Sequence, residues 1–142
     1  LKVAGINPHA GEEGILGSEE KDWLNDALID WNEKNRGIKL LGPLSPDSCW
    51  NSSAKAWLNK DAERHDGILA MYHDQALVPL KLIGFGKSVN ITLGLPLIRT
   101  SVDHGTAFDR AATFHSDSSS MEAAIQSALR LCRNSIVAGD AN

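Results

Sequence analysis

Cysteine, clustered basic residues and long apolar runs are all scarce in this sequence of 142 residues. The two cysteines, Cys49 and Cys132, are far apart without CxxC spacing, so we expect neither a disulfide framework nor a cysteine–zinc site, and a reducing cytoplasm fits better. No apolar run is long enough to span a membrane, and no signal-peptide pattern opens the chain. The net charge of −4, without a lysine or arginine cluster, argues against a nucleic-acid surface.

The rest of the composition is typical of a globular domain. The 12 glycines and 5 prolines are ordinary numbers, and 42% hydrophobic residues are enough for a buried core in one domain. The first residue is Leu1 rather than Met, and the residues after it already have the pattern of a strand. We therefore expect a fragment of a longer protein, or a processed one.

Short apolar runs alternate with segments of helical spacing. Strands are expected over Leu1–Ile6, Ile38–Leu41, Gly67–Tyr72, Val89–Leu93 and Leu97–Thr100. Helices are expected from Ser18 to about Asn35 with a cap at Gly37, over Lys55–Arg64, from Ala107, and over Met121–Val137, while Ala76–Ile83 is short helical or irregular. The continuously apolar run Gly67–Tyr72 favours burial on both faces. This alternation fits βα units and predicts the α/β class.

Apolar residues at helical spacing predict which helix faces enter the core. In the first helix these residues are Trp23, Leu24, Ala27, Leu28 and Trp31. In the last helix they are Ile125, Ala128, Leu129, Cys132 and Ile136.

Three of the five histidines follow expected strands, where open α/β sheets bind their ligands. They are His9, His73 and His104. His9 and His73 have the side chain of a zinc or similar metal ligand, but a histidine at a strand end more often hydrogen-bonds a loop carbonyl. Spacing alone does not decide between these readings, because no HExxH-type local pair is present.

Lys81 and Arg99 lie in otherwise apolar stretches, with Asn90 between them in the sequence. A cation in such a place is either an exposed side chain with a buried stem or a receptor for an anion.

Two glycine-containing segments are weak candidates for ligand binding. The loop NPHAGEEGILG could bring backbone amides to a ligand or form a mobile turn, and Gly84-Phe85-Gly86 lacks the third glycine of a dinucleotide motif.

Three long strings together resemble one family. They are INPHAGEEGILGSEE (Ile6–Glu20), AMYHDQALVPLK (Ala70–Lys81) and GFGKSVNITLGLPLIRTSVDHGTAFD (Gly84–Asp109). They resemble the PdxA family, the 4-hydroxythreonine-4-phosphate dehydrogenases of vitamin B6 synthesis. The family's chains are roughly twice as long, so the resemblance implies that residues 1–142 are the carboxyl-terminal portion of a two-domain α/β enzyme, similar to isocitrate and isopropylmalate dehydrogenases, with the amino-terminal part absent.

The resemblance gives the candidate residues roles. The family holds a divalent metal (zinc, magnesium or cobalt) with three histidines at a homodimer interface. Two of these correspond to His9 and His73, and the third belongs to the amino-terminal part. Substrate contacts correspond to Lys81, Asn90 and Arg99, and Lys81 is also a candidate for proton exchange if it is buried.

DHGTAFD resembles a loop that contacts the dinucleotide in related dehydrogenases. This implies that His104, Gly105, Thr106 and Ala107 lie near NAD or NADP. The sequence then departs from the family's pattern, because the glycines expected after Asp109 are missing, which puts cofactor contacts beyond that residue in question.

The implied reaction is NAD-dependent, metal-dependent oxidation with decarboxylation of 4-phosphohydroxy-L-threonine. One alternative is a paralogous dehydrogenase for a phosphorylated sugar acid or a dihydrodiol carboxylate. Another is a truncated, inactive domain that only binds or dimerises.

Overall fold

The structure is a computed structural model that describes residues 1–59, 65–113 and 115–139. The chain forms two compact units, Leu1–Pro79 and Leu80–Asn142, and the boundary falls within helix α3 (His73–Gly84). Each unit combines strands with helices, which confirms the predicted mixture of α and β structure. Among the described residues, no helix is both long and apolar enough to cross a membrane.

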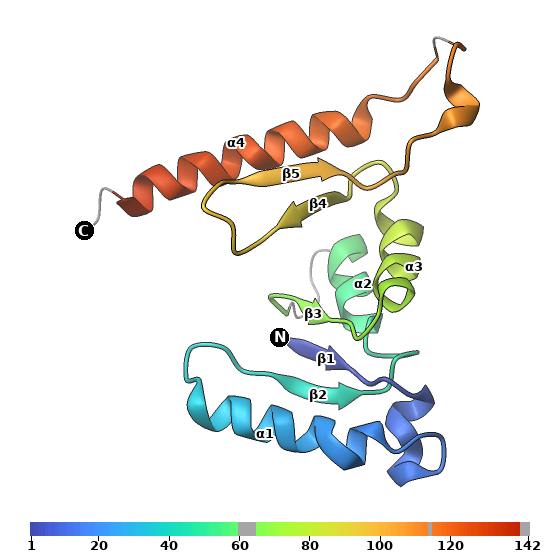
Figure 1. Ribbon diagram of the computed structural model, residues 1–142, viewed down its shortest axis with the longest axis vertical. Coiled ribbons are helices and arrows are strands. Elements are labelled where there is room, and N and C mark those ends of the chain that lie inside the picture. The colour runs from blue at the N-terminus through green and yellow to red at the C-terminus, as the bar shows by residue number, and fades with distance from the viewer. Residues whose placement is uncertain (60–64, 114, 140–142) are drawn as a thin grey trace. The chain divides into compact units, whose positions relative to one another are not determined.

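The first unit contains a parallel sheet of three strands in the order β2–β1–β3 (Figure 1). The strands are β1 (Lys2–Ala4), β2 (Leu41–Leu44) and β3 (Ile68–Leu69). Because β1 is the central strand and pairs in parallel with both neighbours, the carboxyl ends of all three strands lie at one edge of the sheet. This edge is where ligands bind in open α/β sheets.

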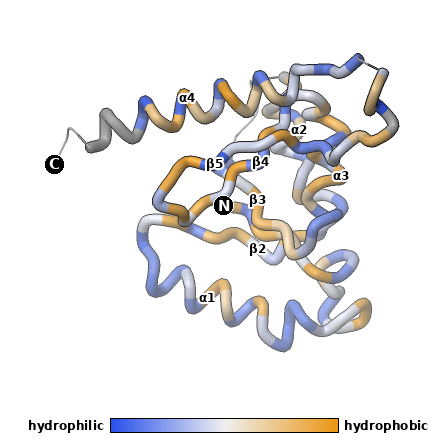
Figure 2. The backbone as a smooth tube through the Cα atoms, turned by 45° about the horizontal axis from the view of Figure 1, so that its top comes forward, coloured by the Kyte–Doolittle hydropathy of each residue, from blue (hydrophilic) through white to orange (hydrophobic). Residues whose placement is uncertain are grey.

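The helix predicted from Ser18 is present as one π-helical turn (Glu20–Leu24) continued by α1 (Asn25–Lys34). Its core-facing side is narrower than expected, because Leu24 and Leu28 pack on Val3 of β1 while Trp23 and Trp31 remain 49% and 41% exposed. Figure 2 shows hydrophobic and hydrophilic residues alternating along α1, as burial of one side requires. Burial of a leucine side chain contributes about 1.5–3 kcal/mol.

The second strand begins later than predicted. The side chain of Asn32 binds both backbone groups of Leu40, accepting from its N–H at 2.8 Å and donating to its carbonyl at 2.9 Å. Sheet pairing therefore starts only at Leu41, whose N–H donates to the carbonyl of Leu1 at 2.8 Å. Pro43 lies inside β2 rather than after it, and this is tolerated because β2 is an edge strand. The predicted cap at Gly37 is also wrong, because α1 ends at Lys34.

The other expected elements of the first unit are present with shifted bounds. Helix α2 (Asn51–Asn59) starts four residues before the predicted Lys55, and residues 60–64 of the predicted helix lie outside the described part of the chain. Strand β3 is much shorter than Gly67–Tyr72, and Leu69 is 47% exposed, so the predicted burial on both faces is wrong. The physical reason is that β3 is an edge strand of the sheet.

The second unit is an antiparallel hairpin of β4 (Val89–Thr92) and β5 (Arg99–Val102), packed against α4 (Ser119–Gly139). The buried side of α4 is formed by Ser120, Ala124 and Ser127, not by Ile125 and Leu129, which are more than half exposed. Small side chains let the helix approach β5 closely, and Thr100 Oγ1 donates to the Ala124 carbonyl at 3.0 Å. The predicted core face of this helix was therefore wrong.

Two further segments complete the second unit. The helix expected from Ala107 is only a 3₁₀ turn, Phe108–Arg110. Ala107 has a φ of +49° and lies before the turn, and the turn ends because Ala111 has a ψ of 138° and Ala112 a φ of +62°, neither of which continues a right-handed helix. The segment Ala76–Ile83, which the sequence left as helical or irregular, is helical and belongs to α3.

Candidate active site

His9 and His73 follow adjacent strands at the same edge of the parallel sheet. His9 lies in the turn Pro8–Gly14 after β1, and His73 is the first residue of α3 after β3. Both imidazoles are exposed, 61% and 77% respectively. The structure thus puts the two predicted metal ligands on neighbouring segments with accessible rings.

Each of the two imidazoles has a carboxylate beside its Nδ1 atom. Glu12 Oε1 lies 3.3 Å from Nδ1 of His9, and Asp74 Oδ1 lies 2.7 Å from Nδ1 of His73. A carboxylate at this nitrogen favours the tautomer with a proton on Nδ1. The lone pair of Nε2 is then available, which is the arrangement of many metal-binding histidines.

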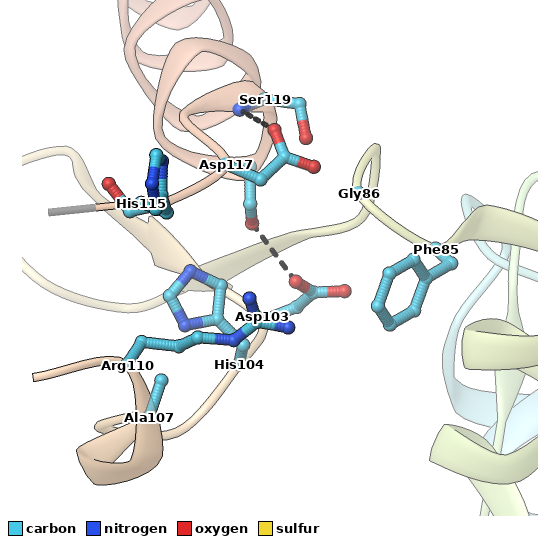
Figure 3. Close-up of a pocket in the computed structure, with 11 residues that line it drawn as sticks. Phe85, Gly86, Asp103, His104, Ala107, Arg110, His115, Asp117 and Ser119 are labelled. Atoms are coloured by element: carbon cyan, nitrogen blue, oxygen red, sulfur yellow. Dashed lines mark hydrogen bonds between the residues drawn. The ribbon is translucent and has the colours of Figure 1, made fainter. Parts of the chain in front are cut away.

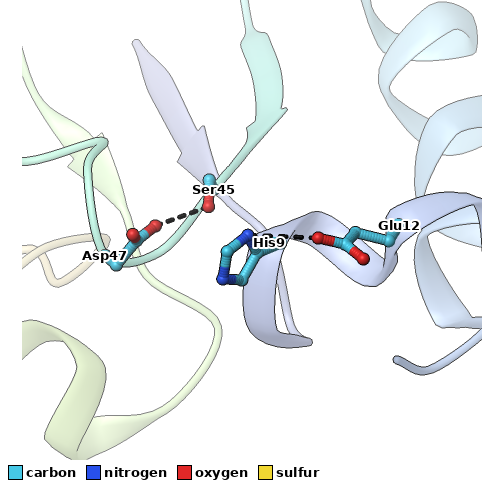
Figure 4. A network of polar contacts seen from close by, with 4 residues as sticks. All are labelled: His9, Glu12, Ser45 and Asp47. Atoms are coloured by element: carbon cyan, nitrogen blue, oxygen red, sulfur yellow. Dashed lines mark hydrogen bonds and ion pairs between the residues drawn. The ribbon is translucent and has the colours of Figure 1, made fainter. Parts of the chain in front are cut away.

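A second carboxylate lies near His9 (Figure 4). Figure 4 shows Glu12 and Asp47 on either side of the His9 imidazole, with Ser45 donating a hydrogen bond of 2.5 Å to Asp47. This bond holds the pKa of the exposed Asp47 carboxyl below its ordinary value of 3.8, and a positive charge on His9 lowers it further. The surroundings of His9 are therefore negative, which favours a bound cation.

Within residues 1–59, 65–113 and 115–139, no three histidine, cysteine, aspartate or glutamate side chains come together in a cluster that could hold a metal ion. The donor chemistry of His9 and His73 nevertheless fits a divalent ion, because each imidazole has a carboxylate beside Nδ1 and an exposed ring. A complete metal site would take a third ligand from outside the described residues of this chain.

The backbone that carries His9 has an unusual conformation. Four residues other than glycine have positive φ, and their values are 53° at His9, 54° at Ala10, 43° at Glu12 and 57° at Glu13. Left-handed geometry costs roughly 1–2 kcal/mol for each L-residue, so other contacts must stabilise this turn. The glycine-rich loop is a turn in the structure, and the two interpretations that the sequence left open for it stay predictions.

Gln75 is a positioning residue that the sequence did not reveal. Its buried side chain donates from Nε2 to the Gly5 carbonyl and accepts at Oε1 from the Met71 N–H, both at 2.7 Å. These bonds join the end of β1 to the end of β3, two residues after His73. The only sequence signal is a glutamine in an apolar context, which does not reveal a partner 70 residues away.

Asn90 and Arg99 share one face of the β4–β5 hairpin. Asn90 is paired with Ser101 and Thr92 with Arg99, and directly paired residues of antiparallel strands point to the same side. The opposite side includes Thr100, which contacts α4. Arg99 Nη1 donates to Thr92 Oγ1 at 2.8 Å, which fixes an exposed guanidinium beside an exposed amide.

Lys81 lies in the last turn of α3, and its side chain is exposed. The amine is not buried in the structure, and the role of Lys81 in proton exchange stays a prediction. Among the described residues, no hydrogen bond joins Lys81 to Asn90 or Arg99. Its amine remains available to an anion from solvent.

A pocket of about 620 Å³ lies in the second unit (Figure 3). Of the four residues predicted near the dinucleotide, His104 and Ala107 line this pocket, whereas Gly105 and Thr106 do not. The lining also includes residues that the sequence did not single out as cofactor contacts, namely Phe85, Asp103, Arg110, His115 and Asp117. Three of these follow Asp109, so the segment that lacks the family's glycines still contributes to the pocket.

Local hydrogen bonds hold the polar groups of this pocket. Asp103 Oδ1 accepts from Ser120 Oγ at 3.0 Å, and Asp117 Oδ1 accepts from the Ser119 N–H at 2.9 Å (Figure 3). The bonds from Ser119 lower the pKa of the Asp117 carboxyl, and a positive charge on His104 acts in the same direction. The carboxylates of Asp103 and Asp117 are thus tied to the start of α4.

Comparison with known proteins shows the family of the chain. Residues 1–128 match the family described as "Pyridoxal phosphate biosynthetic protein PdxA". The chain belongs to the PdxA family. It is 49% identical over 133 residues to the 4-hydroxythreonine-4-phosphate dehydrogenase of Synechococcus sp. (strain RCC307), covering 92% of this chain and 40% of that protein. The chain therefore spans about 40% of the length of this curated relative.

Solved structures match the PdxA chain as well. A 4-hydroxythreonine-4-phosphate dehydrogenase from Klebsiella pneumoniae superimposes with a TM-score of 0.70 at 46% identity, over 89% of this chain and 36% of that one. A terephthalate 1,2-cis-dihydrodiol dehydrogenase from Burkholderia xenovorans LB400 gives a TM-score of 0.57 at 32% identity. This match covers 88% of this chain and 37% of that one. The first of these structures is the more similar by both TM-score and identity.

Proposed function

We propose that this chain forms part of an NAD(P)-dependent, metal-dependent 4-hydroxythreonine-4-phosphate dehydrogenase. The reaction would oxidise and decarboxylate 4-phosphohydroxy-L-threonine in pyridoxal 5'-phosphate (vitamin B6) synthesis. The proposal includes the two-domain architecture of isocitrate and isopropylmalate dehydrogenases, of which residues 1–142 would supply the carboxyl-terminal portion. The similarity over 40% of the length of a dehydrogenase supports this assignment.

The observation that carries the proposal is the placement of His9 and His73. They follow adjacent parallel strands, and each has a carboxylate beside Nδ1 that leaves Nε2 available. We assign both as ligands of one divalent ion, either zinc, magnesium or cobalt. When bound, such an ion lowers the pKa of a substrate hydroxyl and stabilises charge on its oxygen.

The hairpin supplies the groups that hold the substrate. Arg99 presents a guanidinium oriented by Thr92, and Asn90 presents an amide on the same face. Guanidinium groups bind carboxylate and phosphate through paired hydrogen bonds. Lys81 adds an exposed cation on α3. These three residues are assigned to the anionic groups of the substrate, and their role is orientation and neutralisation of charge.

The pocket around His104 is assigned to the dinucleotide, which accepts the hydride. Its volume of about 620 Å³ is in the range of ligand pockets, and the exposed ring of Phe85 offers a surface for a planar base. Asp103, His104 and Arg110 provide polar groups for ribose and phosphate. Gly105 and Thr106 remain candidate contacts of the dinucleotide, because they follow His104 in the same loop.

A working site needs one more metal ligand than this chain's two histidines, since catalytic sites of this kind use three protein ligands. We propose that the missing ligand comes from the amino-terminal part of the enzyme, and that the site is completed at a homodimer interface. The proposal places the protein in a reducing cytoplasm, as expected from two cysteines without CxxC spacing.

An assay of the natural protein that contains this sequence tests the proposal. Production of NADH or NADPH is followed with 4-phosphohydroxy-L-threonine and, in parallel, with a cis-dihydrodiol carboxylate, in the presence of zinc, magnesium or cobalt. Turnover of the first substrate supports the proposal. Turnover of the second alone would assign the paralogous activity, and turnover of neither would favour an inactive binding domain.

A further inference from the structure

The carboxylate of Glu20 is buried beside the turn that carries His9. Glu20 is 4% exposed, and Oε1 accepts hydrogen bonds from the N–H groups of Ile6 at 2.6 Å and Asn7 at 2.8 Å. Oε2 accepts from Asn7 Nδ2 at 2.8 Å. Within the described part of the chain this carboxylate has no ion-pair partner, so its charge is stabilised by these donors.

The ionised form of Glu20 is favoured despite burial. Desolvation raises the pKa of this carboxyl, but the hydrogen bonds from Asn7 and Ile6 outweigh that effect, and the net pKa lies below the ordinary value of 4.5. Three donors converging on one carboxylate form a rigid contact, because each bond is strengthened by the charge.

Glycines surround this contact where any side chain would collide. A Cβ at Gly5 would lie 2.9 Å from Oε1 of Glu20, and a Cβ at Gly11 would lie 2.8 Å from Oε2. A Cβ at Gly17 would lie 2.1 Å from Cγ of Asn7. The segment before His9, the turn after it and the residues leading into the helix thus all close around Glu20 and Asn7.

The turn that follows Asn7 is disfavoured for L-residues, since His9, Ala10, Glu12 and Glu13 are left-handed. Such a conformation persists only where its surroundings fix it. We propose that Glu20 is a positioning residue for the metal-ligand turn, holding Asn7 and through it the direction of the His9 imidazole. This inference rests on the proposed role of His9 as a metal ligand.

A simpler role for Glu20 would be to stabilise the fold near the start of the helix. The two roles differ in what they change: a purely structural residue alters the stability of the metal-free protein, whereas a positioning residue alters the geometry and affinity of the metal bound by His9. Glu20→Gln separates them, because it keeps the size of the side chain and removes the charge. Glu33→Gln, on the exposed side of α1, is the matched control.

The test uses Co²⁺ and the natural protein that contains this sequence. We measure the Co²⁺ dissociation constant by chelator competition, the visible absorption of bound Co²⁺, and the melting temperature of the metal-free protein. Glu20→Gln should weaken Co²⁺ binding about 10-fold or more and change the spectrum. Glu33→Gln should match the wild type in Co²⁺ affinity and in the Co²⁺ spectrum. Unchanged Co²⁺ affinity and spectrum in Glu20→Gln, with a lower melting temperature, would overturn the proposal.

Two further variants keep the result decisive. If Glu20→Gln does not fold, Asn7→Ser replaces it. This substitution removes the side-chain amide that donates to Oε2 of Glu20 and to Oε2 of Glu19 but keeps the backbone donors to Oε1 of Glu20, and it should weaken Co²⁺ binding in the same way, with the same overturning result. His9→Ala distinguishes the two levels of the argument. If His9→Ala loses Co²⁺ and Glu20→Gln binds Co²⁺ as tightly as the wild type, only the positioning role of Glu20 fails. If His9→Ala binds Co²⁺ like the wild type, the metal site itself is wrong and the positioning role falls with it.

Discussion

The side-chain amide of Gln75 donates a 2.7 Å hydrogen bond to the carbonyl of Gly5, across 70 residues of sequence. Gly5 ends the first strand region and Gln75 lies two residues after His73, so this bond links the segments that carry the two candidate metal ligands. The second bond of Gln75, from the Met71 N–H, fixes the other end of the amide. The buried side chain of Gln75 therefore adds to the backbone pairing of β1 with β3 in holding the ends of these two strands together.

Gln75→Ala is expected to lower the free energy of unfolding by about 2–4 kcal/mol, because the Gly5 carbonyl and the Met71 N–H both lose a buried partner. Urea denaturation measures the change. Gln126→Ala, at an exposed position of α4, should change stability by less than about 0.5 kcal/mol. If the two substitutions lower the free energy of unfolding equally, the bridge from Gln75 does not stabilise the fold.

The stability that Glu20 provides should depend on pH. Its pKa in the folded protein lies below the ordinary value of 4.5, so its contribution is fully present above about pH 4.5 and is lost as the pH falls through the folded-state pKa. The difference in unfolding free energy between wild type and Glu20→Gln should therefore be largest near neutral pH and shrink in acid. Urea titrations from neutral pH down to about pH 3 measure it, and a difference that stays constant would contradict the assignment.

Arg99→Ala should weaken substrate binding more than it slows turnover. Loss of a hydrogen bond to a charged group is worth about 1.5–3 kcal/mol, which corresponds to a rise in KM of roughly 10–100-fold. Steady-state kinetics of the natural enzyme measure the change, with Lys87→Ala as a control for the loss of one exposed positive charge in the same unit. KM and kcat values that both match the wild type would reject the role of Arg99.

Ala107→Leu should interfere with the dinucleotide and leave the substrate unaffected. Ala107 lines the pocket next to His104, and a larger side chain there would occupy part of its volume. Overfilling a packed site costs about 1–3 kcal/mol, so the KM for NAD or NADP should rise roughly 10-fold or more. Ala111→Leu adds the same side chain to an exposed position outside the pocket lining and should have no such effect. If the two variants bind the dinucleotide equally well, the pocket has another role.

Local patterns in the sequence were sufficient for much of the fold. The apolar run before Asn7 gives β1, and the helical spacing of Leu24 and Leu28 gives the helix that packs on Val3. The resemblance of three long strings selected the family and, with it, the candidate residues. Periodicity and turn residues act over short stretches of chain, which is why these predictions hold.

The remaining features depend on contacts that short stretches of sequence do not encode. The start of β2 is set by Asn32 binding Leu40, and the bridge of Gln75 joins residues 70 apart. The buried face of α4 follows from close packing on β5, which selects Ser127 over the larger Leu129. Glu20 has the pattern of an ordinary acidic residue at a helix start, and only its burial beside Asn7 distinguishes it.

The central claim is that His9 and His73 bind one metal ion. Elemental analysis after extensive dialysis of the natural protein tests it most directly, with His65→Ala as the control histidine. Wild type and His65→Ala should each retain about one divalent ion per chain, and His9→Ala and His73→Ala should each lose it. Stoichiometric metal retained in either His9→Ala or His73→Ala would contradict the account.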